Sequence, residues 1–208
     1  MSLTPEQIEK NWNQFRSLCE KLGDRSGPVL KMLDDLGMRL CLCPASSKRD
    51  YHGAFPGGLV DHSMRVLNHL VALNKAYGWN LPKASMIIAA LFHDIGKCGL
   101  PGSDSTNDFY VPQTDGWRVE KLGEEYTYNN SIAYLTTPDR SIFMMQHYQI
   151  KLTPDEFLGI KLNDGFIVQD NKPYGLKISP LVYGVMTADY VSTMVEKNVP
   201  YWPIPAAE

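Results

Sequence analysis

A chain of 208 residues fits one globular domain with short appendages and is long enough to bury a hydrophobic core. Hydrophobic residues make up 44% and charged residues 21%, which is typical of globular proteins and excludes an intrinsically disordered chain. The formal net charge of -3 gives no global positive field, so a long duplex nucleic acid is disfavoured as a partner. A local cluster of basic residues or a metal ion can still bind a small anion.

The four cysteines are too few and too scattered for a disulfide scaffold, so we expect reduced thiols and a cytoplasmic protein. Cys41 and Cys43 form a C-x-C pair, but no second pair with zinc-finger spacing follows it, and we interpret both as semi-buried thiols. The N-terminus has neither a basic region nor an apolar run, and the apolar stretch at residues 86–92 is too short to span a bilayer. We therefore expect neither export nor contact with a membrane.

Residues that favour the start of a helix lie close to the N-terminus. Thr4-Pro5-Glu6-Gln7 combines a capping residue, a proline at the first helical position and a glutamine three residues after the cap, which predicts a helix ending at Leu22. A second short helix is predicted over residues 28–36, and residues 44–58 are rich in Ser, Gly and Pro, which indicates an irregular segment. We expect residues 1–24 to form an N-terminal helix packed on the domain.

Two longer helices are predicted in the middle of the chain. Residues 59–77 carry apolar side chains at three- and four-residue steps and are followed by Gly78. Residues 84–95 are almost uniformly apolar, as expected of a helix that is buried on nearly all sides, and Gly96 is a candidate C-cap.

Glycine, proline, aspartate and asparagine are spaced through residues 99–123 in a way that breaks any helix. Within this insertion Phe109-Tyr110-Val111 and Trp117-Arg118-Val119 could pair as a small β-hairpin. The remaining predicted elements are helices over residues 130–135 and 139–148, a helix beginning at Thr153, a Gly-rich and partly extended turn over residues 163–175, and a final helix over residues 180–196.

These elements predict an all-α fold with a small β-hairpin or loop insertion. We see no internal repeat and no domain boundary, so residues 25–198 are expected to form one domain. Three prolines within residues 199–208 indicate a Pro-rich C-terminal tail.

The adjacent pair His93-Asp94 directly follows the apolar run at residues 86–92. A carboxylate in such surroundings costs several kcal/mol unless something compensates its charge. A divalent cation does so, and imidazole and carboxylate suit Mn, Fe, Co, Ni, Zn or Mg. Taken alone, however, the dipeptide is better explained by a core histidine bonded to a backbone carbonyl, with the aspartate capping a neighbouring loop.

Three segments of the chain favour the interpretation of His93-Asp94 as metal ligands. They are Gly57-Gly58-Leu59-Val60-Asp61-His62-Ser63, Leu91-Phe92-His93-Asp94-Ile95-Gly96-Lys97 and Ala188-Asp189-Tyr190-Val191-Ser192. Their order of His, His-Asp and Asp, with Gly-Gly-Leu before the first histidine and Ile-Gly-Lys after the pair, closely resembles the HD superfamily of metal-dependent phosphohydrolases. The resemblance covers residues 51–195 and implies a compact bundle of helices, in agreement with the helical patterning.

The resemblance implies that the metal is bound by His62, His93, Asp94 and Asp189. Such an ion lowers the pKa of bound water and neutralises the charge that builds on a phosphoryl oxygen. We therefore regard Asp94, which could orient this water, and Lys97, one turn beyond the pair, as candidate catalytic residues. Lys97 is also a candidate phosphate contact, and its alternative role is a solvated cation favoured at a helix end by the macrodipole.

Many members of this superfamily carry two further histidines that hold a second metal. This chain has none near Thr137 or at Asn163, where the resemblance would place them. We therefore expect one divalent ion with four protein ligands. His147 or Asp164 could contribute to a second metal site, although a packed or surface histidine is the simpler interpretation of His147.

Three more residues are candidate substrate contacts. His52 lies in a loop where relatives often carry a histidine, and loop residues on a rigid scaffold frequently contact substrates. Arg65 and Arg140 could bind phosphate, although arginines at such positions more often form surface salt bridges. His69 shares a helix face with His62, but two helical turns separate them by about 10 Å, so we interpret His69 as structural.

The leading functional hypothesis is hydrolysis of a phosphate ester in a nucleotide, a small phosphorylated substrate, by a metal-activated water. One alternative is a 3′-end exonuclease acting on short single strands, because residues 51–58 are also similar to exonuclease members; the negative net charge weighs against it. The other is a regulatory protein that binds metal and nucleotide without hydrolysis. The base, the sugar and the oligomeric state do not follow from the sequence.

Overall fold

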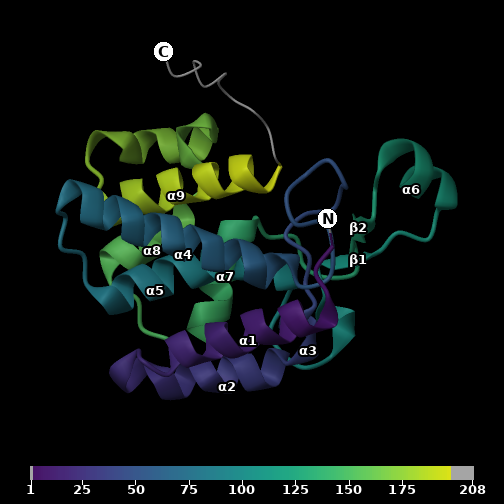
Figure 1. Ribbon diagram of the computed structural model, residues 1–208, viewed down its shortest axis with the longest axis horizontal. Coiled ribbons are helices and arrows are strands. Elements are labelled where there is room, and N and C mark those ends of the chain that lie inside the picture. The colour runs from purple at the N-terminus through teal and green to yellow at the C-terminus, as the bar shows by residue number, and fades with distance from the viewer. Residues whose placement is uncertain (1, 198–208) are drawn as a thin grey trace, which may run out of the picture.

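The computed structural model describes residues 2–197, so the predicted tail at residues 199–208 lies outside the described residues. The regular secondary structure of the described chain is helical apart from one small hairpin (Figure 1), which confirms the all-α prediction. The α-helices are α1 (Pro5–Cys19), α2 (Ser26–Leu36), α3 (Met38–Cys41), α4 (Gly58–Tyr77), α5 (Lys83–Phe92), α6 (Gly116–Leu122), α7 (Thr137–His147), α8 (Pro154–Lys161) and α9 (Pro180–Glu196). The strands are β1 (Tyr110–Pro112) and β2 (Tyr126–Tyr128), and short 3-10 helices are η1 (Gly23–Arg25), η2 (Ile95–Cys98), η3 (Ser105–Asn107), η4 (Gly165–Ile167) and η5 (Gln169–Leu176).

Helix α4 lies at the centre of the bundle and packs mainly against α9 and α5. Helix α8 packs against α9 and α5, and α7 packs against α8 and the 3-10 helix η2. The N-terminal helices α1 and α2 lie together along one side of the bundle (Figure 1), where Phe15 of α1 meets Phe92 of α5 edge to face with ring centroids 5.7 Å apart. The apolar faces of helices from both halves of the chain therefore form one core.

Capping residues mark the starts of several helices as the sequence predicts, although α1 ends at Cys19 and not at Leu22. The Thr4 side chain accepts from the backbone of Gln7 and the Gln7 side chain accepts from the backbone of Thr4, which forms a capping box. Helix α4 ends at Gly78, which has a left-handed conformation. Helix α5, in contrast, ends at Phe92, so Gly96 is not its C-cap.

Gly96 serves tight packing instead. A Cβ atom at this position would lie 2.4 Å from the backbone oxygen of Thr137, at the start of α7. Only glycine lets α7 approach the chain segment that directly follows His93-Asp94.

The insertion does contain a small hairpin, but its second strand is further along the chain than predicted. Strand β1 pairs antiparallel with β2, and Tyr110 faces Tyr128. Residues 117–119 lie in helix α6 because the Asp115 side chain accepts from two of its first backbone amides and Gly123 ends it in a left-handed conformation. These capping signals outweigh the strand propensity of Trp and Val, and α6 projects away from the bundle (Figure 1).

Two other predictions were wrong. Residues 130–135 form no helix, because the Asn129 side chain holds a turn by accepting from the Ser131 amide and Thr136 already caps the start of α7. Residues 163–175 are not extended and instead form the 3-10 helices η4 and η5 over most of their length. Both segments are short, so local turn chemistry decides their conformation.

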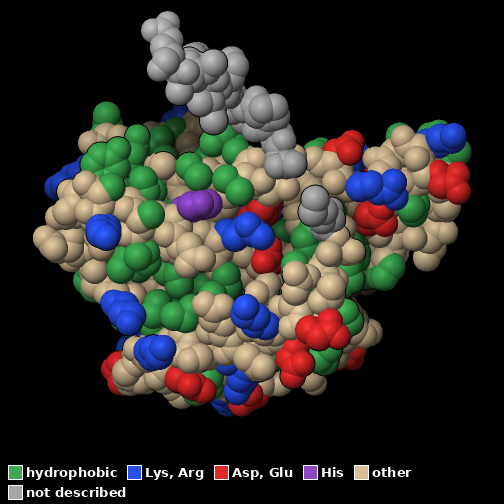
Figure 2. All heavy atoms as spheres, viewed as in Figure 1, with side chains coloured by type: hydrophobic (Ala, Val, Ile, Leu, Met, Phe, Trp, Pro, Cys, Tyr) green, Lys and Arg blue, Asp and Glu red, His purple; other side chains and the backbone are tan. Residues whose placement is uncertain are grey.

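None of the helices in the described part of the chain is both long and apolar enough to cross a membrane. Basic and acidic side chains are interspersed over the face shown in Figure 2. Cys41 and Cys43 are both buried, with 6% of each residue exposed, rather than semi-buried.

Candidate metal centre

Three helices bring the residues of the sequence pattern together. Helix α4 carries His62, the end of α5 leads into His93 and Asp94, and α9 carries Asp189. Both histidines are fully buried, and 4% of Asp94 is exposed. Because α4 packs against both α5 and α9, residues more than a hundred positions apart in the sequence meet in the interior of the bundle.

The ring nitrogens and carboxylate oxygens of these residues face one small volume. The Nε2 atom of His62 lies 3.1 Å from Asp189 Oδ1 and 3.9 Å from Asp94 Oδ2. The Nε2 atom of His93 lies 3.4 Å from Asp94 Oδ2 and 3.8 Å from Asp189 Oδ1. One ion at the centre of this group could therefore contact all four side chains after small adjustments.

The hydrogen bonding of both rings favours a cation at Nε2. His93 uses Nδ1 to donate to the carbonyl of Ala90 at 2.9 Å, and His62 Nδ1 lies 2.9 Å from Glu196 Oε1. The buried Nε2 atoms of both rings make no hydrogen bond of normal geometry and face the carboxylates of Asp189 and Asp94 instead. A buried nitrogen without a well-formed hydrogen bond is costly, and a bound metal ion would satisfy both.

The charges of the centre also favour a cation. Asp94, Asp189 and Glu196 contribute three carboxylates, and Lys97 contributes one ammonium whose Nζ lies 2.6 Å from Asp94 Oδ2. Burial alone would raise the pKa of Asp94, but Lys97 and the neighbouring histidine hold it well below its usual range. Burial would likewise lower the pKa of His62, but Asp189 and Glu196 raise it to about 9. In the absence of a metal ion, protonation of His62 therefore compensates part of the carboxylate charge, and a bound cation would take over this role.

A fifth donor, His52, lies beside this group. Its ring centroid is 4.6 Å from that of His62, and its buried Nε2 atom has no hydrogen-bond partner. Burial and the positive charges of Lys97 and His62 lower the pKa of His52 to about 3, so its ring is neutral. The loop that carries it is held by close packing of two glycines, because a Cβ atom on Gly58 would lie 2.1 Å from the oxygen of Gly53.

The other predicted substrate contacts lie in different surroundings. Arg65 is partly exposed on α4 and pairs with Asp61 at 2.8 Å. Arg140 is not a surface residue, because only 1% of it is exposed and it donates to the backbone oxygens of Gly96 and Leu135. Neither guanidinium contacts the four side chains of the centre.

Two residues of the centre were not recognised from the sequence. Glu196 follows Asp189 by seven positions on α9, and this spacing is the signal that puts both on one helix face. Asn163 is buried, and its amide nitrogen lies 3.4 Å from Asp94 Oδ1. The missing histidine at this position is thus replaced by an amide that still contacts the site.

Two histidines and one aspartate that were candidates from the sequence are not among these donors, although the charges of Asp94 and Asp189, together with burial, raise the pKa of Asp164. His147 is exposed at the end of α7, and Asp164 is exposed beside the buried Asn163. His69 contacts Ser192 across the interface between α4 and α9, with 2.8 Å between Nδ1 and the hydroxyl oxygen, which agrees with a structural role. None of the three belongs to a group of metal-ligating atoms within the described residues.

Two sets of three donors have their ligand atoms within 4.8 Å of one another: His62, His93 and Asp189, and His52, His62 and Asp94. Nitrogen and oxygen donors of this kind suit a borderline or hard divalent cation. The residues therefore fit such an ion.

Comparison with known proteins agrees with this chemistry. The family model of the HD domain matches residues 59–194, which is more than half of the chain and includes the four side chains of the centre. Neither the curated proteins nor the solved structures contain a match to the chain. The chain therefore belongs to the HD domain family, in the superfamily of metal-dependent phosphohydrolases.

Proposed function

We propose that the protein hydrolyses a phosphate ester of a nucleotide at a single divalent metal ion held by His62, His93, Asp94 and Asp189. The observation that carries this proposal is the pair of buried Nε2 atoms that make no hydrogen bond of normal geometry and face two carboxylates. A bound divalent ion would lower the pKa of a water molecule and offset the charge on a phosphoryl oxygen.

The protein's own side chains would then hold and orient the reactants. Asp94 would accept a hydrogen bond from the attacking water through the oxygen that it does not use for the ion. Lys97 lies at the edge of the centre with 14% of its side chain exposed, and its ammonium would bind a phosphate oxygen. The neutral ring of His52 could donate to or accept from the substrate beside His62.

Purified protein incubated with Mn, Co, Ni or Mg and a panel of nucleoside mono-, tri- and cyclic phosphates tests this function. We expect release of phosphate from, or ring opening of, at least one of these compounds. Lys97→Ala should lower turnover while metal content stays at the wild-type level, whereas Asp94→Ala should lose both metal and turnover. Metal-loaded wild type that turns over none of the panel would refute hydrolysis.

The same experiment separates the non-catalytic alternative. Tight binding of a nucleotide in calorimetry, with a full complement of metal and no turnover, would support a regulatory protein. Degradation of a short single-stranded oligonucleotide from its 3′ end would support the exonuclease alternative.

A further inference from the structure

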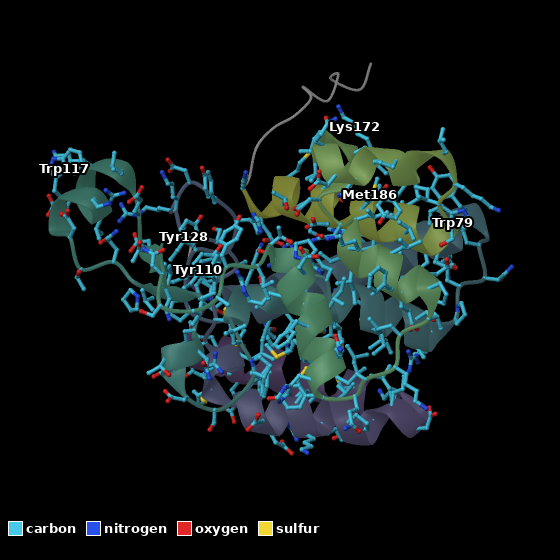
Figure 3. The ribbon with its side chains drawn as sticks, turned by 180° about the vertical axis from the view of Figure 1, so that it is seen from behind. Trp79, Tyr110, Trp117, Tyr128, Lys172 and Met186 are labelled. Atoms are coloured by element: carbon cyan, nitrogen blue, oxygen red, sulfur yellow. The ribbon has the colours of Figure 1, made fainter. Side chains whose placement is uncertain are left out.

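A cavity of about 440 Å³ lies between the hairpin and the start of α7, outside the metal centre. Its size is within the range of about 300–1,000 Å³ that is typical of sites for small molecules. Aromatic rings of Phe109, Tyr110, Tyr128 and Tyr134 line it. Figure 3 shows Tyr110 and Tyr128 close together on the hairpin, while Trp117 lies at the far end of the insertion.

The cavity adjoins the metal centre. Tyr110 lines both this cavity and a smaller one of about 160 Å³ that is lined by Lys97. On the other wall, Thr137 and Arg140 line the large cavity and pack directly against Gly96. Gly96 lies two positions after Asp94 and directly before Lys97, so this wall of the cavity packs against the segment that carries both residues.

Arg140 places a buried positive charge in this wall of the cavity. It is almost fully buried, and no carboxylate among residues 2–197 pairs with it. Its two terminal nitrogens donate to the carbonyls of Gly96 at 2.8 Å and Leu135 at 2.6 Å, its Nε atom has no partner, and its guanidinium lies 3.9 Å from the centroid of the Phe109 ring. With 1% of the residue exposed, Arg140 has too little free surface to chelate a phosphate.

The rest of the lining is neutral. Tyr128 is 52% exposed and Tyr134 is 87% exposed, so both have ring surface that no other part of the described chain covers. The Asn130 side chain adds an amide with donors and an acceptor. Aromatic faces and an amide suit a neutral, planar group with polar edges, whereas they would not compensate the charge of a phosphate.

We propose that this cavity binds the nucleobase of the substrate while its phosphate lies at the metal centre. The proposal rests on the proposed hydrolysis of a nucleotide and assigns the selectivity for the base to the hairpin and the segment before α7. Tyr128 and Tyr134 stack on the base, and the buried guanidinium of Arg140 supplies positive potential behind an acceptor atom of the ring.

Binding of nucleosides tests the cavity independently of catalysis. We would titrate adenosine, guanosine, cytidine and uridine into metal-free wild-type protein in the presence of EDTA and measure heat. At least one nucleoside should bind, and ribose 5-phosphate, which lacks a base, should bind more weakly by about tenfold or more. No binding of any nucleoside, or equal binding of ribose 5-phosphate, would overturn the proposal.

Substitution of the exposed rings locates the site. Tyr128→Ala and Tyr134→Ala should each weaken nucleoside binding by about tenfold, because one stacked ring is lost. Tyr128→Phe keeps the ring and should bind at the wild-type level. Tyr183→Ala, which removes a similarly exposed tyrosine from α9, is the matched control and should change nothing.

Kinetics then separate the two proposals. Tyr128→Ala should raise the KM of a nucleotide substrate about tenfold, whereas the control Tyr183→Ala should leave the KM at the wild-type value. An unchanged KM in Tyr128→Ala would overturn the assignment of the base to this cavity while the hydrolytic function stands. If metal-loaded wild type turns over no phosphate ester, the hydrolytic function fails, and the nucleoside titration still decides whether the cavity binds a base.

Discussion

Removal of the Glu196 carboxylate should weaken metal binding although Glu196 is not expected to contact the ion. Its oxygen lies 2.9 Å from His62 Nδ1, with 8% of the glutamate side chain and none of the histidine side chain exposed, so solvent hardly screens the pair. Such a carboxylate holds the ring with the proton on Nδ1 and leaves Nε2 free for the metal. Glu196 lies in the last turn of α9, where a negative charge interacts unfavourably with the helix dipole. The bond to His62 offsets this unfavourable interaction.

The loss of comparable partners costs about 10- to 100-fold in metal affinity, or about 1.4–2.8 kcal/mol. We therefore expect Glu196→Ala to weaken binding of Mn or Co by this factor. Glu196→Gln should lose less, because its amide oxygen can still accept from Nδ1. Glu120→Ala is a suitable control, since Glu120 is exposed on α6, which projects away from the bundle.

Competition between the protein and a fluorescent chelator measures these affinities without any turnover. Nitrogen NMR shifts of the His62 ring provide a second measurement, because loss of Glu196 should increase the population of the tautomer with its proton on Nε2. Wild-type affinity in Glu196→Ala, with the tautomer unchanged, would refute the reasoning.

Three further changes follow from other parts of the structure. Gly96→Ala should lower the free energy of unfolding by about 1–3 kcal/mol, because its Cβ would lie 2.4 Å from a backbone oxygen of α7. The control Gly27→Ala would meet nothing within 4 Å and should be neutral or stabilising. Urea denaturation measures both, and equal stability of the two variants would contradict this packing argument. Burial opposes the charge of Glu156, but Arg25 pairs with it and lowers its pKa below 4.5. The pair therefore stabilises the fold above pH 4.5, and this contribution is lost as the pH falls. Glu156→Gln should flatten the fall in unfolding free energy below pH 4.5, and an unchanged pH profile would contradict this expectation. His93→Ala should lose its metal in elemental analysis while its circular dichroism spectrum stays helical. The control His69→Ala should keep its metal. Retention of full metal by His93→Ala would show that the site is elsewhere.

Local signals in the sequence suffice for most helices of this protein. The capping box at Thr4 and Gln7, the proline at the start of α8 and the glycine after α4 act within a few residues, so they can be read without the fold. The same reasoning failed at α6 and at residues 130–135, where the strand propensity or the helical pattern was weaker than one capping side chain.

The candidate site likewise depends partly on local sequence patterns and partly on tertiary packing. His62, His93, Asp94 and Asp189 were predicted because their order and their flanking glycines form a pattern along the chain. Their common volume exists only because α4 packs between α5 and α9, a contact between distant segments that no local signal specifies.

The tertiary structure alone decided the roles of the side chains outside this pattern. Arg140 has an ordinary sequence context, and its burial against Phe109 depends on how the insertion folds over α7. Glu196 lies far from His62 in sequence, and only the pairing of α4 with α9 brings its carboxylate to the ring. The amino-acid sequence by itself determined the helical class and the four residues proposed to hold the metal, while the partners of those residues and the adjoining cavity result from long-range packing.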